Sequence, residues 1–330
     1  MTDYFIAWWN LENLFDTHDA VRLRKVEKAV GSDLKDWDQA KLDKKLDNLV
    51  EVIAKMNSDK GPDLLGVCEV EKKELLEQLV TKIEAKIAGR KYDIAFAEGP
   101  DKRGIDVAFI FDKEAFVPYI VEEEGKKDYI FSHEVVKRSP TRDILQVNLA
   151  TKTKKDKPII FIGNHWYARS GGVYQGEPYR IIAAETLSYW CSRINEIHGN
   201  NGWAPTVVMG DFNGLPWERA LSEYALSTRV LSRVDNAREK PWLLNLMWSA
   251  IGTGGTYYYK NEPFMLDQFL VSKGLFQNES TFTHDPLSVQ IITDPNKDGQ
   301  PRRHGLPAKG NYDVDGYSDH FPISMVISQN

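Results

Sequence analysis

Thr206-Val-Val-Met-Gly-Asp-Phe-Asn-Gly214 is the stretch on which the fold and the site of this chain depend. An apolar strand ends here on the carboxylate of Asp211 and the amide of Asn213. Side chains alternate between the two faces of a strand, so residues two apart point to the same side. Gly210 and Gly214 allow a tight backbone path around the pair. An acid and an amide placed in this way can hold a metal ion, a water molecule and a phosphate together.

Three further apolar runs have an oxygen-bearing side chain at one end. They place Asn10 after Tyr4–Trp9, Glu69 after Asp63–Cys68, and Asp319 before Phe321-Pro-Ile323. Mg²⁺ prefers oxygen ligands and usually takes one or two protein carboxylates together with substrate phosphate. Glu69 is the first choice for the main ligand, because an unpaired carboxylate at the end of a buried strand is expensive to desolvate. The alternative is that Glu69 is a solvated strand-end residue.

Two histidines stand at comparable places, since His165 follows an apolar run and His320 follows Asp319. A histidine can transfer a proton near neutral pH, or as a cation it can stabilise a pentavalent phosphorus centre. It does so best when a carboxylate fixes its tautomer, and Asp267 on an apolar strand is the candidate. These groups indicate metal-assisted hydrolysis of a phosphoester. A structural role for each histidine is the alternative.

Composition limits the classes of protein that the chain can belong to. Its 330 residues, 42% apolar and 27% charged, are typical of a globular protein. A net charge of -6 disfavours tight non-specific binding of long nucleic acid, although a local basic groove is compatible with it. The apolar runs are shorter than the ~20 residues of a membrane span, and no secretory signal is visible. The default expectation is therefore a cytoplasmic location without a membrane span; a secreted chain that lacks its signal is the alternative.

The order of helical and strand-like segments predicts the fold class. Apolar residues at helical spacing predict helices over residues 38–57 and 72–88, and a third from near Pro178 to Ile197. The remaining apolar runs read as strands, so mixed or antiparallel sheets with helices outside are expected. Residues 152–157 read as a lysine-rich hairpin tip. Because the candidate site residues are scattered from Asn10 to His320 with no linker between them, residues 1–330 are predicted to form a single domain.

Six short motifs in a fixed order give the chain a family resemblance. They are W-N-L-E-N at Trp9–Asn13, C-E-V-E at Cys68–Glu71, G-N-H-W at Gly163–Trp166, G-D-F-N at Gly210–Asn213, L-D-Q-F-L-V-S at Leu266–Ser272 and S-D-H-F-P-I at Ser318–Ile323. This set resembles the endonuclease/exonuclease/phosphatase superfamily, and most of all its nuclease-like bacterial members. The resemblance implies an α/β fold, the DNase I-like four-layer αββα sandwich of two mixed β-sheets. It also implies a divalent metal and in-line attack of water on phosphorus.

The resemblance assigns roles residue by residue. Glu69 corresponds to the metal ligand with Asn10 beside it, and Asp319 to a second-metal ligand. Asp211 and Asn213 correspond to the pair that orients the water and binds phosphate. His320, paired with Asp267, corresponds to the base or phosphate-stabilising group, and His165 to the other histidine of the nuclease and sphingomyelinase branches. Whether Asp211 or His320 takes the proton of the water stays open.

The predicted function is metal-dependent phosphodiester hydrolysis, with DNA or RNA as the leading substrate. Asn213, Arg169 and Asn164 are expected to bind the substrate phosphate, since an arginine can contact phosphate through two hydrogen bonds. The alternative substrate is a small phosphate ester, a phosphoinositide or a phospholipid head group. The expected cofactor is Mg²⁺, with Mn²⁺ as an alternative and Ca²⁺ as a supporting ion. No protein partner is indicated.

Overall fold

Strand β1 (Thr2–Leu14) is buried on both faces, which explains why it reads as a continuous apolar run. In this computed structural model, Ile6 and Trp8 face one hydrophobic core, and Ala7 and Trp9 face another. Strands covered on both sides carry apolar residues at successive positions. The structure describes residues 1–123, 125–199, 203–276, 280–285, 287–293 and 299–330.

The described strands form two large mixed sheets. Sheet A contains β1 with β2 (Leu64–Val70), β3 (Tyr92–Phe96), β4 (Asp106–Asp112), β17 (Phe282–His284), β18 (Gln290–Ile291) and β19 (Ile323–Gln329). Sheet B contains β5 (Phe116–Pro118), β8 (Ile130–His133), β9 (Ile144–Thr151), β10 (Lys154–His165), β11 (Thr206–Asp211), β12 (Ser227–Thr228), β13 (Leu243–Asn245) and β16 (Asp267–Ser272). Sheet A has the order β17-β19-β1-β2-β4-β3 with β18 beside β19, and sheet B the order β12-β13-β16-β11-β10-β9-β5 with β8 beside β9.

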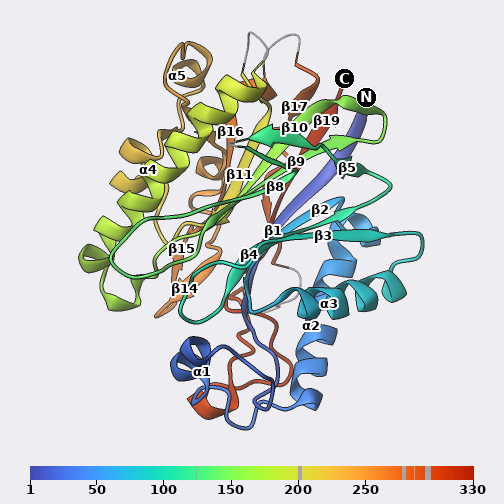
Figure 1. The fold of residues 1–330 in the computed structure, drawn as a ribbon, viewed down its shortest axis with the longest axis vertical. Coiled ribbons are helices and arrows are strands. Elements are labelled where there is room, and N and C mark those ends of the chain that lie inside the picture. The colour runs from blue at the N-terminus through green and yellow to red at the C-terminus, as the bar shows by residue number, and fades with distance from the viewer. Residues whose placement is uncertain (124, 200–202, 277–279, 286, 294–298) are drawn as a thin grey trace.

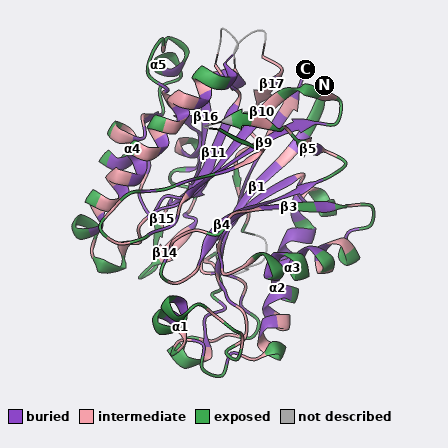
Figure 2. Ribbon diagram, in the orientation of Figure 1, coloured by how far each residue is buried: buried purple, intermediate pink, exposed green. Residues whose placement is uncertain are grey.

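Helices cover the outer faces of the two sheets, so the molecule has four layers (Figure 1). Helices α2 (Gln39–Asp59) and α3 (Lys73–Lys86) pack on sheet A, and α4 (Val173–His198) packs on sheet B. The core between the sheets joins Trp8 and Phe109 of sheet A to Phe161 and Phe269 of sheet B. Figure 2 shows the buried strands in the middle and the exposed helix surfaces outside. The predicted four-layer αββα sandwich of two mixed sheets is confirmed.

Shorter elements complete the chain. They are α1 (Arg24–Val30), α5 (Leu231–Asp235), the hairpin β6 (Val121–Glu123) with β7 (Lys126–Asp128), the hairpin β14 (Tyr257–Tyr259) with β15 (Glu262–Phe264), 3-10 turns at Arg169–Gly171, Leu246–Ala250, Lys273–Leu275 and Pro307–Lys309, and a π-helical turn at Ala220–Tyr224. No helix within these described residues is long and apolar enough to cross a membrane.

The predicted helices agree with the structure except at one boundary. Helix α2 starts after Asp38, whose carboxylate accepts a hydrogen bond from the backbone N–H of Lys41 at 3.0 Å. Helix α4 begins at Val173, so the prediction of a start near Pro178 was wrong. A proline favours the first turns of a helix without fixing the first residue. The lysine-rich tract contains a hairpin turn, as predicted, but the turn is limited to residues 152–153, because β9 ends at Thr151 and β10 already begins at Lys154.

The first and last strands of the chain pair with each other. β1 runs antiparallel to β19, with Thr2 opposite Gln329 and Trp8 opposite Ile323. The two termini consequently lie close together (Figure 1). This pairing supports the proposal that residues 1–330 form one domain.

Candidate active site

Three predicted site residues lie side by side at one edge of sheet B. His165 at the end of β10 is opposite Asp211 at the end of β11, and Asp211 is opposite Asp267 at the start of β16. Residues opposite each other on neighbouring strands point to the same face of a sheet. Gly210 lets β10 come close, because a Cβ atom there would lie 2.5 Å from the Asn164 carbonyl oxygen. The sheet register therefore brings together residues that are far apart in sequence.

Sheet A supplies Asn10 and Glu69 through irregular strand ends. Asn10 is the last β1 residue paired with β2 before the register shifts, and Glu69 lies at a similar shift in β2. Glu69 has a φ of 64°, a left-handed conformation that is uncommon outside glycine. Bulges of this kind redirect a side chain away from the regular pleat. One carboxylate oxygen of Glu69 accepts a hydrogen bond from the backbone N–H of Asn13 at 2.8 Å.

His320 is held by a buried carboxylate, as predicted for an oriented histidine. Its Nδ1 atom lies 2.6 Å from Oδ2 of Asp267, and Oδ1 of Asp267 accepts a hydrogen bond from Nε1 of Trp8 at 3.0 Å. Its Nε2 atom lies 3.9 Å from Oδ2 of Asp211. Burial opposes protonation, but the charges of Asp267 and Asp211 outweigh it and raise the pKa of His320 well above its usual value. His320 is therefore an imidazolium at neutral pH.

Asp211 stands at the centre of the cluster. Asn10 donates a hydrogen bond from Nδ2 to Asp211 Oδ2 at 3.1 Å, and the backbone N–H of Asn213 donates to Oδ1 at 2.9 Å. Burial raises the pKa of Asp211 to about 7, although the charge of His320 opposes this shift. Asn213 has a φ of 48°, and its Nδ2 donates to the carbonyl oxygen of Trp166 at 3.2 Å. Asp211 and Asn213 thus form one unit at the strand end.

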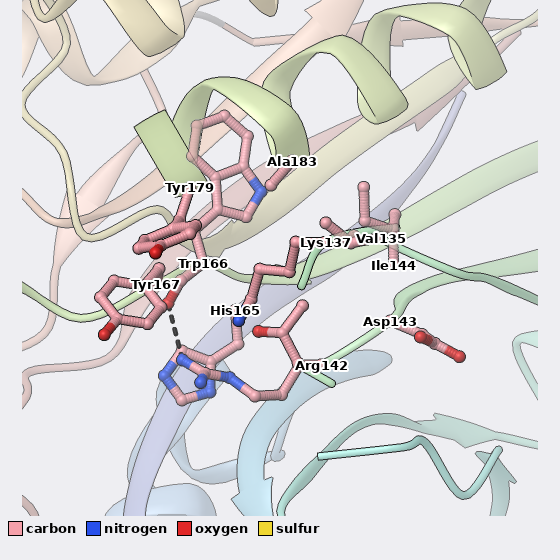
Figure 3. Close-up of a pocket in the computed structure, with 11 residues that line it drawn as sticks. Val135, Lys137, Arg142, Asp143, Ile144, His165, Trp166, Tyr167, Tyr179 and Ala183 are labelled. Atoms are coloured by element: carbon pink, nitrogen blue, oxygen red, sulfur yellow. Dashed lines mark hydrogen bonds between the residues drawn. The ribbon is translucent and has the colours of Figure 1, made fainter. Parts of the chain in front are cut away.

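His165 lies on the other side of the same carboxylates. Its Nε2 atom is 3.5 Å from Oε1 of Glu69 and 3.8 Å from Oδ2 of Asp211. Burial and the charge of Arg142 lower the pKa of His165 well below its usual value, so the ring is neutral. His165 also lines a cavity of about 10 Å³, where Arg142 lies beside it (Figure 3). Arg142 donates from Nη2 to the Trp166 carbonyl oxygen at 2.7 Å.

The donor set fits a hard divalent cation. Glu69, Asp211 and the amide of Asn10 offer oxygen atoms, which Mg²⁺ and Mn²⁺ prefer. Asp211, Asp267 and His320 also have ligand atoms within 4.8 Å of one another. Both oxygens of Asp267 already accept hydrogen bonds from Trp8 and His320, so that trio is better described as a histidine with its orienting carboxylate. Glu69 and Asp211 are the carboxylates that lie beside His165, and a metal at Asp211 would share its oxygens with the hydrogen bonds from Asn10 and Asn213.

Two predicted residues are engaged elsewhere. The amide of Asn164 is fully buried; its Oδ1 accepts a hydrogen bond from Nε1 of Trp166 at 3.0 Å, and its Nδ2 donates to backbone carbonyls. Asn164 therefore presents no group to a phosphate in this conformation. Asp319 lies next to His320 but is bound by the guanidinium of Arg303. Its role as a second-metal ligand stays a prediction.

Arg169 lies within reach of the cluster. Its Nη1 atom donates to the carbonyl oxygen of Asn213 at 3.3 Å and contacts Oε1 of Glu218 at 2.7 Å. Its guanidinium carbon is 5.6 Å from the centre of the Phe264 ring. A phosphate role for Arg169 stays a prediction, and Glu218 offsets part of its charge.

Sequence reasoning missed three residues that hold the site together. Trp8 bonds Asp267, Arg142 bonds the backbone next to His165, and Ser318 joins the sheet A edge to His320. The hydroxyl of Ser318 donates to the Asn10 carbonyl oxygen at 2.6 Å and accepts from the His320 N–H at 3.1 Å. Ser318 opens a recognised motif and Trp8 directly precedes one, so position in the sequence was a usable signal. Arg142 carried no such signal.

Comparisons with known proteins agree with this geometry. The profile described as "Endonuclease/Exonuclease/phosphatase family" matches residues 5–329. No curated protein sequence matches the chain. A solved protein of that family from Bacteroides thetaiotaomicron is 16% identical, covers 100% of this chain and 98% of its own, and has a TM-score of 0.56.

Two further solved structures share the fold. The mannosyl-6-phosphatase of Bacteroides thetaiotaomicron is 15% identical over 98% of this chain and 99% of its own, with a TM-score of 0.54. The catalytic domain of human Nocturnin is 16% identical over 99% of this chain and 95% of its own, with a TM-score of 0.54. At this identity the likeness concerns the fold alone.

Proposed function

The chain belongs to the endonuclease/exonuclease/phosphatase family, and from this premise we propose that it is a divalent-metal-dependent phosphodiesterase that hydrolyses nucleic acid. Members of this family are hydrolases that act on phosphoester bonds. The observation that carries the proposal is the placement of His320, held by Asp267 at 2.6 Å and facing Asp211 at 3.9 Å. An acid and a base beside a set of oxygen ligands are the parts that in-line phosphoester hydrolysis requires.

Glu69, Asp211 and Asn10 are the residues that would hold the ion. When bound, a divalent cation supplies charge stabilisation to the phosphoryl oxygens and lowers the pKa of a water molecule. Mg²⁺ is the proposed ion, with Mn²⁺ as a substitute. The site residues proposed for phosphate are Asn213 and Arg169.

Asp211 is the proposed base. Its carboxylate lies 3.9 Å from His320 and beside the proposed ion, where it can accept a proton from the attacking water. The water oxygen forms the new bond to phosphorus, and the bond to the leaving oxygen breaks. His320, which is protonated at neutral pH, stabilises the negative charge on the phosphorane and gives its proton to the leaving oxygen. Asp267 holds Nδ1 of His320, so the proton leaves from Nε2 and the ring becomes the neutral imidazole protonated on Nδ1.

His165 favours a diester as substrate. It is neutral and lies beside Glu69 and Asp211, where it can donate or accept a hydrogen bond without adding charge. The family resemblance associates a histidine at this place with nucleases and sphingomyelinases. The alternative substrate is a small phosphate ester, a phosphoinositide or a phospholipid head group. One protein of the same fold is a mannosyl-6-phosphatase, so a sugar phosphate belongs in any substrate panel.

Hydrolysis of a substrate panel with Mg²⁺ or Mn²⁺ tests this proposal. The panel contains plasmid DNA, single-stranded DNA, RNA, abasic DNA, sphingomyelin, an inositol polyphosphate and mannose 6-phosphate. The expected result is cleavage of a nucleic acid that stops in EDTA and in His320→Ala. His284→Ala is the matched control, because His284 pairs with Ile327 at the far end of β19. Absence of nucleic-acid cleavage with every metal would refute the nuclease assignment, and selective release of phosphate from a small ester would favour the alternative.

A further inference from the structure

Arg303 is clamped between two carboxylates at the metal-binding edge. Its Nε atom lies 2.8 Å from Oε1 of Glu12, and its Nη2 atom contacts Oδ2 of Asp319. Glu12 is two residues from the candidate ligand Asn10, and Asp319 precedes His320. The guanidinium therefore stands beside the candidate site.

Glu12 is a fixed anchor for this arginine. It is 4% exposed, and its second carboxylate oxygen accepts a hydrogen bond from the His304 N–H at 2.7 Å. Its own N–H donates to Oδ1 of Asn10 at 2.9 Å. A buried carboxylate of this kind needs a cation, because desolvating an unpaired charge is very costly. Arg303 supplies that cation, and Glu12 thereby connects Arg303 to the side chain of Asn10.

The chain segment that carries Arg303 is itself held in place. Asn48 of α2 donates from Nδ2 to the carbonyl oxygens of Val314 at 2.9 Å and Gly316 at 2.7 Å. Lys309 contacts Asp33 at 2.9 Å on the same side. In Figure 1 this orange-red segment lies beside α1 and the lower part of α2. Packing on the first helices thus sets the position of Arg303.

The carboxylates at this edge fall into two groups, according to the cation that lies beside each of them. Asp267 has the imidazolium of His320 beside it. Glu12 and Asp319 share Arg303, and the buried Lys45 interacts with both of them. Arg142 lies 3.5 Å from Asp101.

Glu69, Asp211 and Asp267 share the single imidazolium of His320, whose Nδ1 lies 2.6 Å from Asp267 and whose Nε2 lies 3.9 Å from Asp211. His165 lies 3.5 Å from Glu69 and 3.8 Å from Asp211. Three carboxylates and one imidazolium carry a net charge of about -2, which matches the charge of one divalent ion.

We propose that Arg303 takes the place of a second cation at this edge, so that the protein binds one divalent ion at Glu69 and Asp211, with Asp319 outside its ligand set. The inference rests on the proposed metal dependence. It goes further by assigning Asp319 to an arginine, whereas the family resemblance makes Asp319 a second-metal ligand. Arg303 is a positioning residue here, since it holds Glu12 and Asp319 and no reacting atom.

Counting bound Mn²⁺ by calorimetry and by electron paramagnetic resonance tests the proposal without any substrate. The wild type should bind one equivalent. Arg303→Met frees Glu12 and Asp319 and should bind a second equivalent, whereas Arg303→Lys should still bind one. Arg302→Met is the matched control, because Arg302 is equally exposed at 43% and contacts Asp313 and Asp315 instead. It should bind one equivalent.

A second variant keeps the test independent of the folding of Arg303→Met. Asp319→Asn in the wild-type background should change the Kd for Mn²⁺ less than about 2-fold, because Asp319 is not a ligand in this account, while a true charged ligand contributes at least about 10-fold. Two equivalents in the wild type, one in a folded Arg303→Met, or a 10-fold weaker Kd in Asp319→Asn would each overturn the inference alone. If neither the wild type nor any variant binds Mn²⁺, the proposed metal dependence itself is refuted.

Discussion

The Asp267→Asn substitution isolates the link between the buried carboxylate and His320. Trp8 donates its indole N–H to Oδ1 of Asp267, so the asparagine is expected to keep its oxygen there and turn its NH₂ toward Nδ1 of His320. The imidazole then loses a charge-assisted hydrogen bond and is forced into the tautomer protonated on Nε2. The geometry of the site stays the same while the cation is removed.

The expected magnitude follows from the 2.6 Å contact between buried groups. A hydrogen bond to a charged partner contributes about 1.5–3 kcal/mol, which corresponds to about 1–2 units in the pKa of His320. Loss of a positioned proton-transfer group lowers the rate by about 10²- to 10⁴-fold. The pKa is measured by NMR of ¹⁵N-labelled histidines, and kcat with bis(p-nitrophenyl) phosphate, which carries a single diester.

Asp112→Asn is the matched control for this substitution. Asp112 is a buried carboxylate with a basic partner, Arg90, at the opposite end of β4 from the site. Its loss should lower stability and leave the pKa of His320 and kcat unchanged. The reasoning is refuted if Asp267→Asn keeps the pKa of His320 within about 0.3 units and kcat within about 3-fold of the wild type.

Three further predictions concern stability. Burial and the charge of Lys45 lower the pKa of His304 to about 3, so the unfolded chain takes up a proton at a higher pH than the folded protein does. Relative to His304→Gln, the wild type should therefore lose about 2 kcal/mol of unfolding free energy between pH 7.5 and pH 5 in urea titrations. Parallel pH profiles of the two proteins would contradict this. Gly66→Ala should cost about 1–3 kcal/mol, because a Cβ atom would lie 2.6 Å from Trp8 between the sheets, whereas Gly171→Ala meets no atom within 4 Å and should leave the Tm nearly unchanged. Mn²⁺ at 100 times its Kd for the wild type should stabilise the wild type by about 2.7 kcal/mol in thermal unfolding. An equal gain in Glu69→Gln at the same Mn²⁺ concentration would exclude Glu69 as a ligand.

Strand ends were the part of the site that the sequence could predict. His165, Asp211 and Asp267 each end or begin an apolar run, and in a sheet with regular register such ends meet at one edge. The same logic found Asn10 and Glu69. The bulges at these two residues were not predictable, because they arise from the pairing of β1, β2 and β4 and leave no local pattern.

The residues that sequence reasoning missed act across long distances in the chain. Trp8 reaches Asp267, and Arg303 reaches Glu12, through side chains whose partners are set by the packing of two sheets and a long loop. Asn164 is the converse case. It lies in a recognised motif, but its amide is consumed by Trp166 and the backbone, which only the three-dimensional arrangement reveals.

The most direct test of the account is the metal-dependent hydrolysis of a phosphodiester by Glu69→Gln and His320→Ala, compared with the wild type at equal folded concentration. The wild type should cleave with Mg²⁺ or Mn²⁺, and cleavage should stop in EDTA. Both variants should lose at least about 10²-fold in kcat/KM while their circular dichroism spectra stay unchanged. Retention of wild-type kcat/KM by both folded variants would contradict the assignment of this edge as the active site.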